Sequence, residues 1–116
     1  MFKMKIVRKN ELVTYEPKGH YNMLAQRAYG KNETGNEILT IGYSQFLPGG
    51  GAENSVVKDN MELVYYIVKG ELTLTTPEGS TVLKAGDSVG FKAGEERSVK
   101  NESTEVACML VIAGVK

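Results

Sequence analysis

Turns that contain glycine recur at short intervals through the second half of the chain, and this regular spacing of turns limits the possible folds more than any other feature. The runs between the turns are five to ten residues long and rich in Val, Ile, Thr, Tyr and Leu, which is typical of short antiparallel strands. The turns are PGGG at 48–51, KG at 69–70, TPEGS at 76–80, KAGD at 84–87 and KAGEE at 92–96. The sequence therefore predicts an all-β fold, with strands at 38–47, 63–68, 71–75, 81–83, 88–91, 98–100 and 106–113.

The segment LVYYIV, residues 63–68, is apolar on both of its faces. Leu63, Tyr65 and Ile67 would share one face, whereas the residues between them would share the other. In contrast, the hairpin that follows alternates leucine with Glu or Thr, which predicts one buried and one wet face. A closed β-barrel or jelly roll covers the inner face of 63–68, and a second subunit would cover the outer face. We therefore expect a homodimer.

Length, charge and cysteine content exclude several classes of protein. A chain of 116 residues can bury one core, so we expect a single domain. Its 14 basic and 14 acidic residues balance, which argues against nucleic acid as a partner. No run approaches the roughly 20 apolar residues of a membrane span, so we expect no membrane partner. The single cysteine, Cys108, lies in an apolar run as a buried thiol would, which fits a reducing cytoplasm.

The order of these motifs resembles the cupin superfamily, in particular its small single-domain members. The resemblance rests on PGGG, YYIVKGEL and LKAGDSVGFKAGEERSVKNES, and it covers residues 38–113. It implies a double-stranded β-helix, or jelly-roll barrel, at 38–116, preceded by an N-terminal arm at 1–37 that packs on the barrel or on a partner subunit. Within the arm, residues 21–30 fit a strand as well as a helical turn.

The cupin motifs carry three histidines and one glutamate that hold a divalent metal in the barrel, and this chain departs from all four. Counting back from Gly70 places the glutamate position on Leu63. The two histidines of the first motif would fall on Val57 and Asp59, or on Val56 and Lys58. The histidine of the second motif falls on Arg97, which has only donors and cannot ligate a cation. We therefore expect no metal and no other cofactor.

Three polar residues are the main candidates for chemistry in the barrel. Arg97 replaces a ligand that the family points into its pocket, so its guanidinium could bind a carboxylate or phosphate. Alternatively, Arg97 could point to solvent or pair with an acid, namely Glu53, Asp59, Glu95 or Glu96. Glu53 follows the PGGG turn and could accept a proton, and His20, the only histidine, could act as an acid or a base. Both could instead be ordinary surface residues.

Other side chains could line the same pocket. Tyr65 shares the inward face with Leu63, and Asp59 and Met61 lie in the loop and strand start just before it. Tyr43 and Phe46 fall on opposite faces of their strand, so only one of them can join the pocket. A rearranged metal site would need His20, Glu53 and Asp59 to converge.

Three functions follow from these candidates. The first is binding of a small organic ligand, such as a carboxylate, an aromatic or a sugar, without a metal. The second is a metal-independent isomerase, cyclase or lyase that uses Glu53, His20 or Tyr65 as acid or base. The third is a metal-dependent cupin enzyme with displaced ligands. The fold does not decide among them, because one fold hosts many functions.

Overall fold

The computed structural model describes residues 4–115, so the ends of the predicted arm and barrel, residues 1–3 and 116, lie outside the described part. Strands account for most of that part, as the spacing of the glycine-containing turns predicted. The only helices within residues 4–115 are a 3-10 turn at Lys9–Glu11 and α1 (Lys31–Thr34). The strands are β1 (Val13–Tyr15), β2 (His20–Tyr29), β3 (Leu39–Val56), β4 (Met61–Lys69), β5 (Glu71–Thr76), β6 (Gly79–Lys84), β7 (Ser88–Phe91), β8 (Glu96–Lys100) and β9 (Ala107–Val115).

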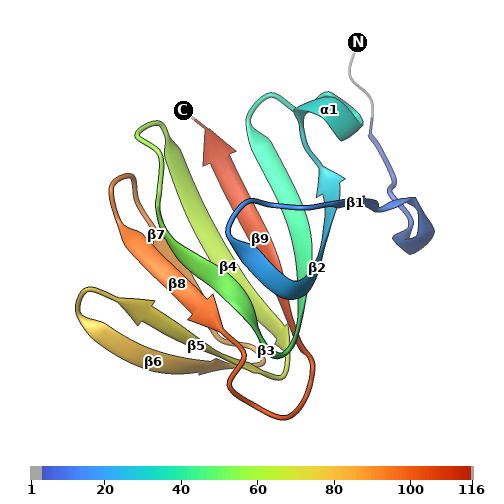
Figure 1. The fold of residues 1–116 in the computed structure, drawn as a ribbon. Helices are drawn as coiled ribbons and strands as arrows, with labels where there is room; N and C mark the ends of the chain where they lie inside the picture. Colours follow the sequence, from blue (N-terminus) through green and yellow to red (C-terminus); the bar gives the residue numbers. More distant parts are fainter. Residues whose placement is uncertain (1–3, 116) are drawn as a thin grey trace.

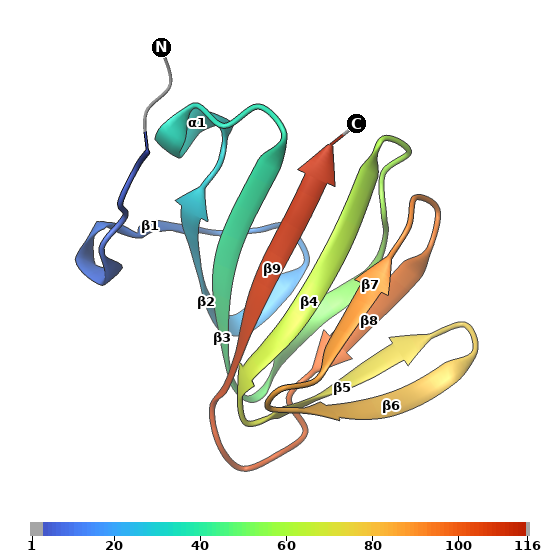
Figure 2. The same ribbon diagram turned by 180° about the vertical axis from the view of Figure 1, so that it is seen from behind.

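All nine strands join in one antiparallel sheet that curls into a nearly closed barrel. The order along the sheet is β6-β5-β8-β3-β9-β4-β7, and β2 and then β1 branch from β3. Strand β3 belongs to both halves of the barrel, because residues 39–46 pair with β9 and residues 51–56 pair with β8. Figure 1 shows β8, β5 and β6 folded over from β2, β3, β9 and β4, and Figure 2 shows the latter four strands side by side from behind. The predicted jelly-roll barrel is confirmed.

The PGGG segment at 48–51 is not the turn that the sequence predicted, because β3 continues through it to Val56. This segment is the corner at which β3 leaves β9 and joins β8. Gly49 has a φ of +82°, which an L side chain rarely adopts. A Cβ on Gly50 would lie 2.1 Å from the Asn22 carbonyl oxygen, and one on Gly51 would lie 2.3 Å from that of Val99. The glycines therefore allow three strands to approach closely at one corner.

Asn101, which matches the second cupin motif, locks this corner from inside. Its side chain is fully buried, and its amide nitrogen donates to the carbonyl oxygens of Phe46 at 3.0 Å and Glu105 at 2.7 Å. Its amide oxygen accepts from the backbone and the hydroxyl of Ser103. Gly49 N also donates to the Asn101 carbonyl at 2.7 Å. Asn101 is thus a structural residue that ties the β8–β9 connection to β3.

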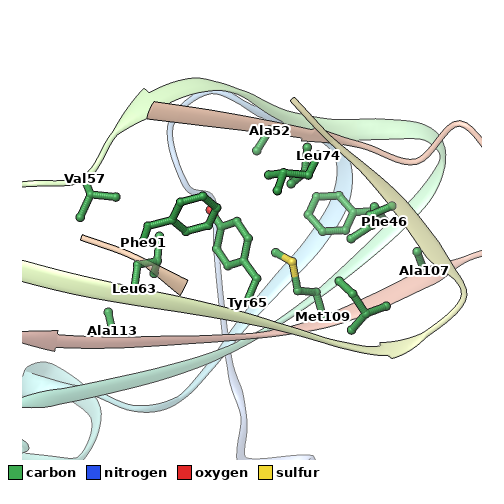
Figure 3. Close-up of a cluster of buried hydrophobic side chains, with 13 residues drawn as sticks. Phe46, Ala52, Val57, Leu63, Tyr65, Leu74, Phe91, Ala107, Met109 and Ala113 are labelled. Atoms are coloured by element: carbon green, nitrogen blue, oxygen red, sulfur yellow. The ribbon is translucent and has the colours of Figure 1, made fainter. Parts of the chain in front are cut away.

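The core fills the barrel interior with inward-facing side chains, most of them from β3, β4, β5, β7, β8 and β9, as Figure 3 shows. On β4, Leu63, Tyr65 and Ile67 are at most 7% exposed, which matches the inward face that the sequence predicted. The Tyr65 and Phe91 rings meet edge to face, with centroids 5.4 Å apart. The remaining core side chains are Phe46, Ala52, Val57, Leu72, Leu74, Val99, Ala107, Met109 and Ala113.

The N-terminal arm forms part of the sheet rather than a separate layer. Residues 21–30, which the sequence left between strand and helix, lie mostly in strand β2, which pairs with β3. The short β1 then pairs with β2. In Figure 1 the blue connection between β1 and β2 crosses the barrel in front of β9. None of the helices within residues 4–115 is long and apolar enough to cross a membrane.

Candidate functional site

A pocket of about 620 Å³ lies in the barrel mouth. We call it the mouth pocket. The β1–β2 connection supplies one wall, β3 and β8 supply another, and β4 and β9 supply the apolar floor. Its volume is in the range typical of small-molecule sites. The lining residues are Tyr15, Pro17, Lys18, Gly19, His20, Arg27, Ser44, Phe46, Ala52, Glu53, Asn54, Ser55, Lys58, Tyr65, Arg97, Ser98, Val99, Met109 and Val111.

Arg97 is half-buried in the wall of this pocket and is held by two side chains. Its Nε donates to the Tyr65 hydroxyl at 3.0 Å, and its Nη1 donates to the Ser55 hydroxyl at 2.9 Å. Its Cζ also lies 5.8 Å from the Tyr65 ring centre and 5.9 Å from that of Phe91, within cation–π range. Neither hydrogen bond uses Nη2. The guanidinium is therefore fixed in orientation by neutral groups, which leave its positive charge uncompensated by those contacts.

Three further cations line the mouth pocket, namely Lys18, Arg27 and Lys58, against a single lining carboxylate, that of Glu53. The Arg27 guanidinium stacks on the Tyr15 ring, with Cζ 4.2 Å from the ring centre. Its Nε is buried without a hydrogen-bond partner among residues 4–115. A buried donor of this kind costs free energy when it stays unpaired. The field in the pocket is thus positive, and it favours an anionic ligand.

His20 and Glu53 lie on adjacent strands at the rim. The backbone N–H of Glu53 donates to the Gly19 carbonyl at 2.9 Å, and His20 pairs with Ala52. The Nδ1 atom of His20 lies 3.0 Å from the Lys18 carbonyl oxygen. Because a carbonyl only accepts, this contact favours the tautomer with the proton on Nδ1, and Nε2 of neutral His20 is then a proton acceptor.

The structure brings four of the predicted site residues together: Arg97, Tyr65, His20 and Glu53 all line the mouth pocket. Met61 and Leu63 line a smaller recess of about 180 Å³ on the far side of Arg97, which also contacts this recess. Asp59 is exposed and lines neither hollow.

Tyr43 does not face the pocket, and Phe46 is the member of that pair that does. The reason is strand parity, because β3 turns Ser44 and Phe46 inward and Tyr43 outward toward Leu110 and Gln26. A hydrogen bond with the Cys108 thiol and partial burial raise the pKa of Tyr43 to about 12. Cys108 itself is a buried free thiol.

The residues present do not fit the metal that the cupin resemblance implies. Leu63 stands at the glutamate position and is buried in the core, and Arg97 stands at a histidine position with donors only. No group of three or more His, Cys, Asp or Glu side chains converges anywhere in the described range 4–115. The rearranged set of His20, Glu53 and Asp59 is therefore not assembled.

Sequence reasoning missed Lys18, Arg27, Lys58, Ser44 and Ser55. Arg27 lies in the segment whose sequence fits a strand and a helical turn equally well. The sequence therefore does not indicate on which side of the barrel wall its side chain lies. The inward parity of Ser44 follows from Phe46 once Phe46 is known to be the buried residue. For Lys18 the sequence holds no signal, because it lies in a loop whose path depends on the folded barrel. Lys58 is marked in the sequence only as one of the alternative positions of a cupin histidine.

Comparison with known proteins places this geometry in context. The family described as Cupin domain matches residues 42–113. A protein named beta-D-galactosidase from Mycobacterium tuberculosis is 33% identical over 108 residues, which cover 93% of this chain and 91% of that protein.

Among solved structures, the polyketide cyclase RemF from Streptomyces resistomycificus is similar, with a TM-score of 0.83 at 15% identity. That match covers 98% of this chain and 81% of the cyclase. A predicted oxalate decarboxylase from Thermotoga maritima has a TM-score of 0.82 at 18% identity, over 97% of this chain and all of the other. At these identities the two structures support the fold alone.

Proposed function

This chain belongs to the cupin family, and on that premise we propose that it binds a small acidic sugar in the mouth pocket without the help of a metal. The observation that carries the proposal is the orientation of Arg97. Its guanidinium is fixed by hydrogen bonds from Nε to Tyr65 and from Nη1 to Ser55, and neither bond uses Nη2. A guanidinium fixed in this way binds a carboxylate at a smaller entropic cost than a mobile one.

The charge of the pocket supports an acidic ligand. Lys18, Arg27 and Lys58 add to the positive charge of Arg97, and the single carboxylate of Glu53 offsets only part of it.

The polar groups of the pocket support a ligand with hydroxyls. Ser44, Ser55, Ser98 and Asn54 distribute small donors and acceptors around an apolar floor that includes Phe46. The galactosidase name of the 33% identical relative is also consistent with a sugar ligand. A hexuronic acid combines the carboxylate and the hydroxyls that these groups would recognise.

Hydrolysis of a glycoside by the usual pair of carboxylates has little support in this pocket. That mechanism places two acids on opposite sides of the bond that breaks, about 5 to 10 Å apart. Glu53 is the only acid among the lining residues. Binding of the sugar is therefore better supported than its hydrolysis.

A second function, metal-independent proton transfer on the bound sugar acid, is favoured by the position of His20. The contact of Nδ1 with the Lys18 carbonyl leaves Nε2 as the proton acceptor at the rim of the pocket. His20 would remove a proton from a carbon next to a carbonyl group, and Glu53 or Tyr65 would return a proton elsewhere on the ligand. Exchange of deuterium from solvent into D-galacturonate, followed by NMR, tests this function. It should be lost in His20→Gln without loss of binding.

The binding test compares D-galacturonate with neutral D-galactose by isothermal titration calorimetry. We expect the acid to bind more tightly, and we expect Arg97→Met to weaken its binding by about 10-fold or more, because a hydrogen-bonded charge pair is lost. Arg8→Met removes an exposed arginine outside the mouth pocket and should leave the affinity unchanged. Equal affinities of the wild type and Arg97→Met for the acid would contradict the proposal.

We further propose that the chain works as a homodimer. We also propose that it works in a reducing cytoplasm, and the free, buried thiol of Cys108 supports that location. Support for the dimer comes from two apolar rows that run across the outside of β4, β9 and β3. One row is Val64, Ile112 and Ile41, and the other is Tyr66, Leu110 and Tyr43. Val64 and Tyr66 are 39% and 42% exposed. An apolar face shared by neighbouring strands is typical of a surface that a partner covers.

A further inference from the structure

A second hollow, of about 440 Å³, lies on the outside of the barrel, where β3, β8, β5 and β6 are neighbours. We call it the outer groove. In contrast to the mouth pocket, whose lining is mostly apolar, more of its lining surface is polar than apolar. Two threonines and two serines line it, namely Thr73, Thr75, Ser80 and Ser98, together with the charged residues Lys100 and Glu102. These groups offer alternating donors and acceptors, which suit a ligand rich in hydroxyls.

The strand register places these side chains on one surface. Lys100 lies opposite both Gly51 and Thr73, and Gly51 in turn lies opposite Tyr21. The row from Tyr21 to Thr73 therefore crosses four strands, β2, β3, β8 and β5. Thr75 lies opposite Ser98 in the next row, and its hydroxyl is 2.9 Å from that of Ser80.

Tyr21 forms an aromatic platform at one end of this row. Its hydroxyl is 2.9 Å from the point that a Cβ on Gly51 would occupy, so the side chain lies across Gly51 and uses the space that the glycine leaves. The side chain is nevertheless 39% exposed. An aromatic ring held along a sheet and open to solvent can stack on the C–H face of a sugar, because that face meets the negative π surface.

The outer groove and the mouth pocket meet at the rim of the barrel. Five residues line both hollows, and two of them, Glu53 and Asn54, are exposed at the rim. The barrel wall between the hollows consists of Ala52, Ser98 and Val99. A ligand that leaves the mouth pocket past Glu53 and Asn54 would therefore enter the outer groove.

We propose that the outer groove is a second sugar subsite, so that the ligand is an acidic oligosaccharide rather than a single sugar. This inference rests on the proposed function: one acidic unit binds Arg97 in the mouth pocket, and the chain crosses the rim. The next units stack on Tyr21 and bond to the threonine and serine hydroxyls. Lys100 supplies a cation for a second carboxylate.

Calorimetry with D-galacturonate, digalacturonate and trigalacturonate tests the subsite. We expect trigalacturonate to bind the wild type about 10-fold more tightly than the monomer, because its further units would stack on Tyr21 and form additional hydrogen bonds. Tyr21→Ala should remove most of that gain and leave monomer affinity unchanged. Tyr21→Leu, which keeps an apolar side chain without the ring, should act in the same way if the alanine variant does not fold. Tyr66→Ala truncates a similarly exposed tyrosine that lines neither hollow and should change neither affinity.

The outcomes separate this inference from the proposed function. If the monomer binds through Arg97 but trigalacturonate binds no more tightly, or if Tyr21→Ala keeps the gain, the outer subsite is wrong and the mouth pocket stands. If trigalacturonate depends on Tyr21 but not on Arg97, the outer subsite stands and the acidic anchor is wrong. If none of the three ligands binds, both proposals are overturned.

Discussion

The two faces of β4 carry nearly the same kinds of side chain and have opposite surroundings. Leu63, Tyr65 and Ile67 face the barrel interior and are at most 7% exposed, whereas Val64, Tyr66 and Val68 face outward and are 39–44% exposed. Each face even carries one tyrosine. The inner Tyr65 accepts a hydrogen bond from Arg97 and touches Phe91, and the outer Tyr66 lies beside Leu110 of β9.

This difference shows how much one strand can do through alternation alone. Because successive side chains point to opposite faces, β4 contributes to the core and the ligand pocket on one side and to a candidate subunit contact on the other. The barrel accounts for the inner face completely. The outer face stays 39–44% exposed within residues 4–115, and the proposed dimer would cover it.

The largest expected difference between the faces is in stability. Ile67→Ala should lower the free energy of unfolding by about 2–5 kcal/mol, because Ile67 is fully buried and its loss leaves a cavity. Val68→Ala, one position further along, should change it by about 0.5 kcal/mol or less, since Val68 is 44% exposed. Urea denaturation at one fixed protein concentration measures both. Similar losses for the two variants would mean that the outer face is buried as deeply as the inner one.

The alternation that underlies this contrast could be predicted from the sequence. In a strand with the sequence LVYYIV, every second residue must lie on the same face. The turns and strands from residue 61 onward could be predicted as well, since glycine separates short apolar runs there. The path of β3 through PGGG could not, because glycines that allow close approach of strands look the same in sequence as glycines that make a turn. The sequence also did not indicate which side chains of residues 20–29 point into the barrel, because that depends on how β2 pairs with β3.

A smaller effect is expected when the outer face is charged. Tyr66→Glu should weaken the proposed dimer by about 100-fold or more, because an unpaired carboxylate would be buried in the contact. Val82→Glu is a matched control, since Val82 is 49% exposed on β6 and lies outside the two apolar rows. Sedimentation equilibrium gives the dissociation constants. A monomeric wild type, or a Tyr66→Glu variant that dimerises as well as the control, would show that a second copy does not cover this face.

The candidate site was only partly predictable, for a related reason. Arg97 and Tyr65 could be predicted because each has a defined place, one in a motif and one in a strand with clear parity. The side-chain chemistry of His20 and Glu53 makes them candidates, but it does not indicate where they lie. Their shared position at the rim depends on the pairing of β2 with β3. The positive field of the pocket could not be predicted from a chain with balanced charges, because Lys18, Arg27 and Lys58 come together only in the folded barrel.

The smallest expected effect isolates the polar group that distinguishes the two tyrosines. Tyr65→Phe keeps the ring in the core and removes only the hydroxyl that accepts from Arg97 Nε at 3.0 Å. The guanidinium then keeps its bond to Ser55 but loses its fixed orientation, so stability should fall by about 1 kcal/mol and galacturonate should bind about 5-fold more weakly. Tyr66→Phe removes a hydroxyl from the outer face and should change neither quantity measurably. Denaturation and calorimetry on both variants decide the matter. If Tyr65→Phe binds as tightly as the wild type, Arg97 does not need its tyrosine to present a carboxylate site, and the inner face of β4 contributes packing alone.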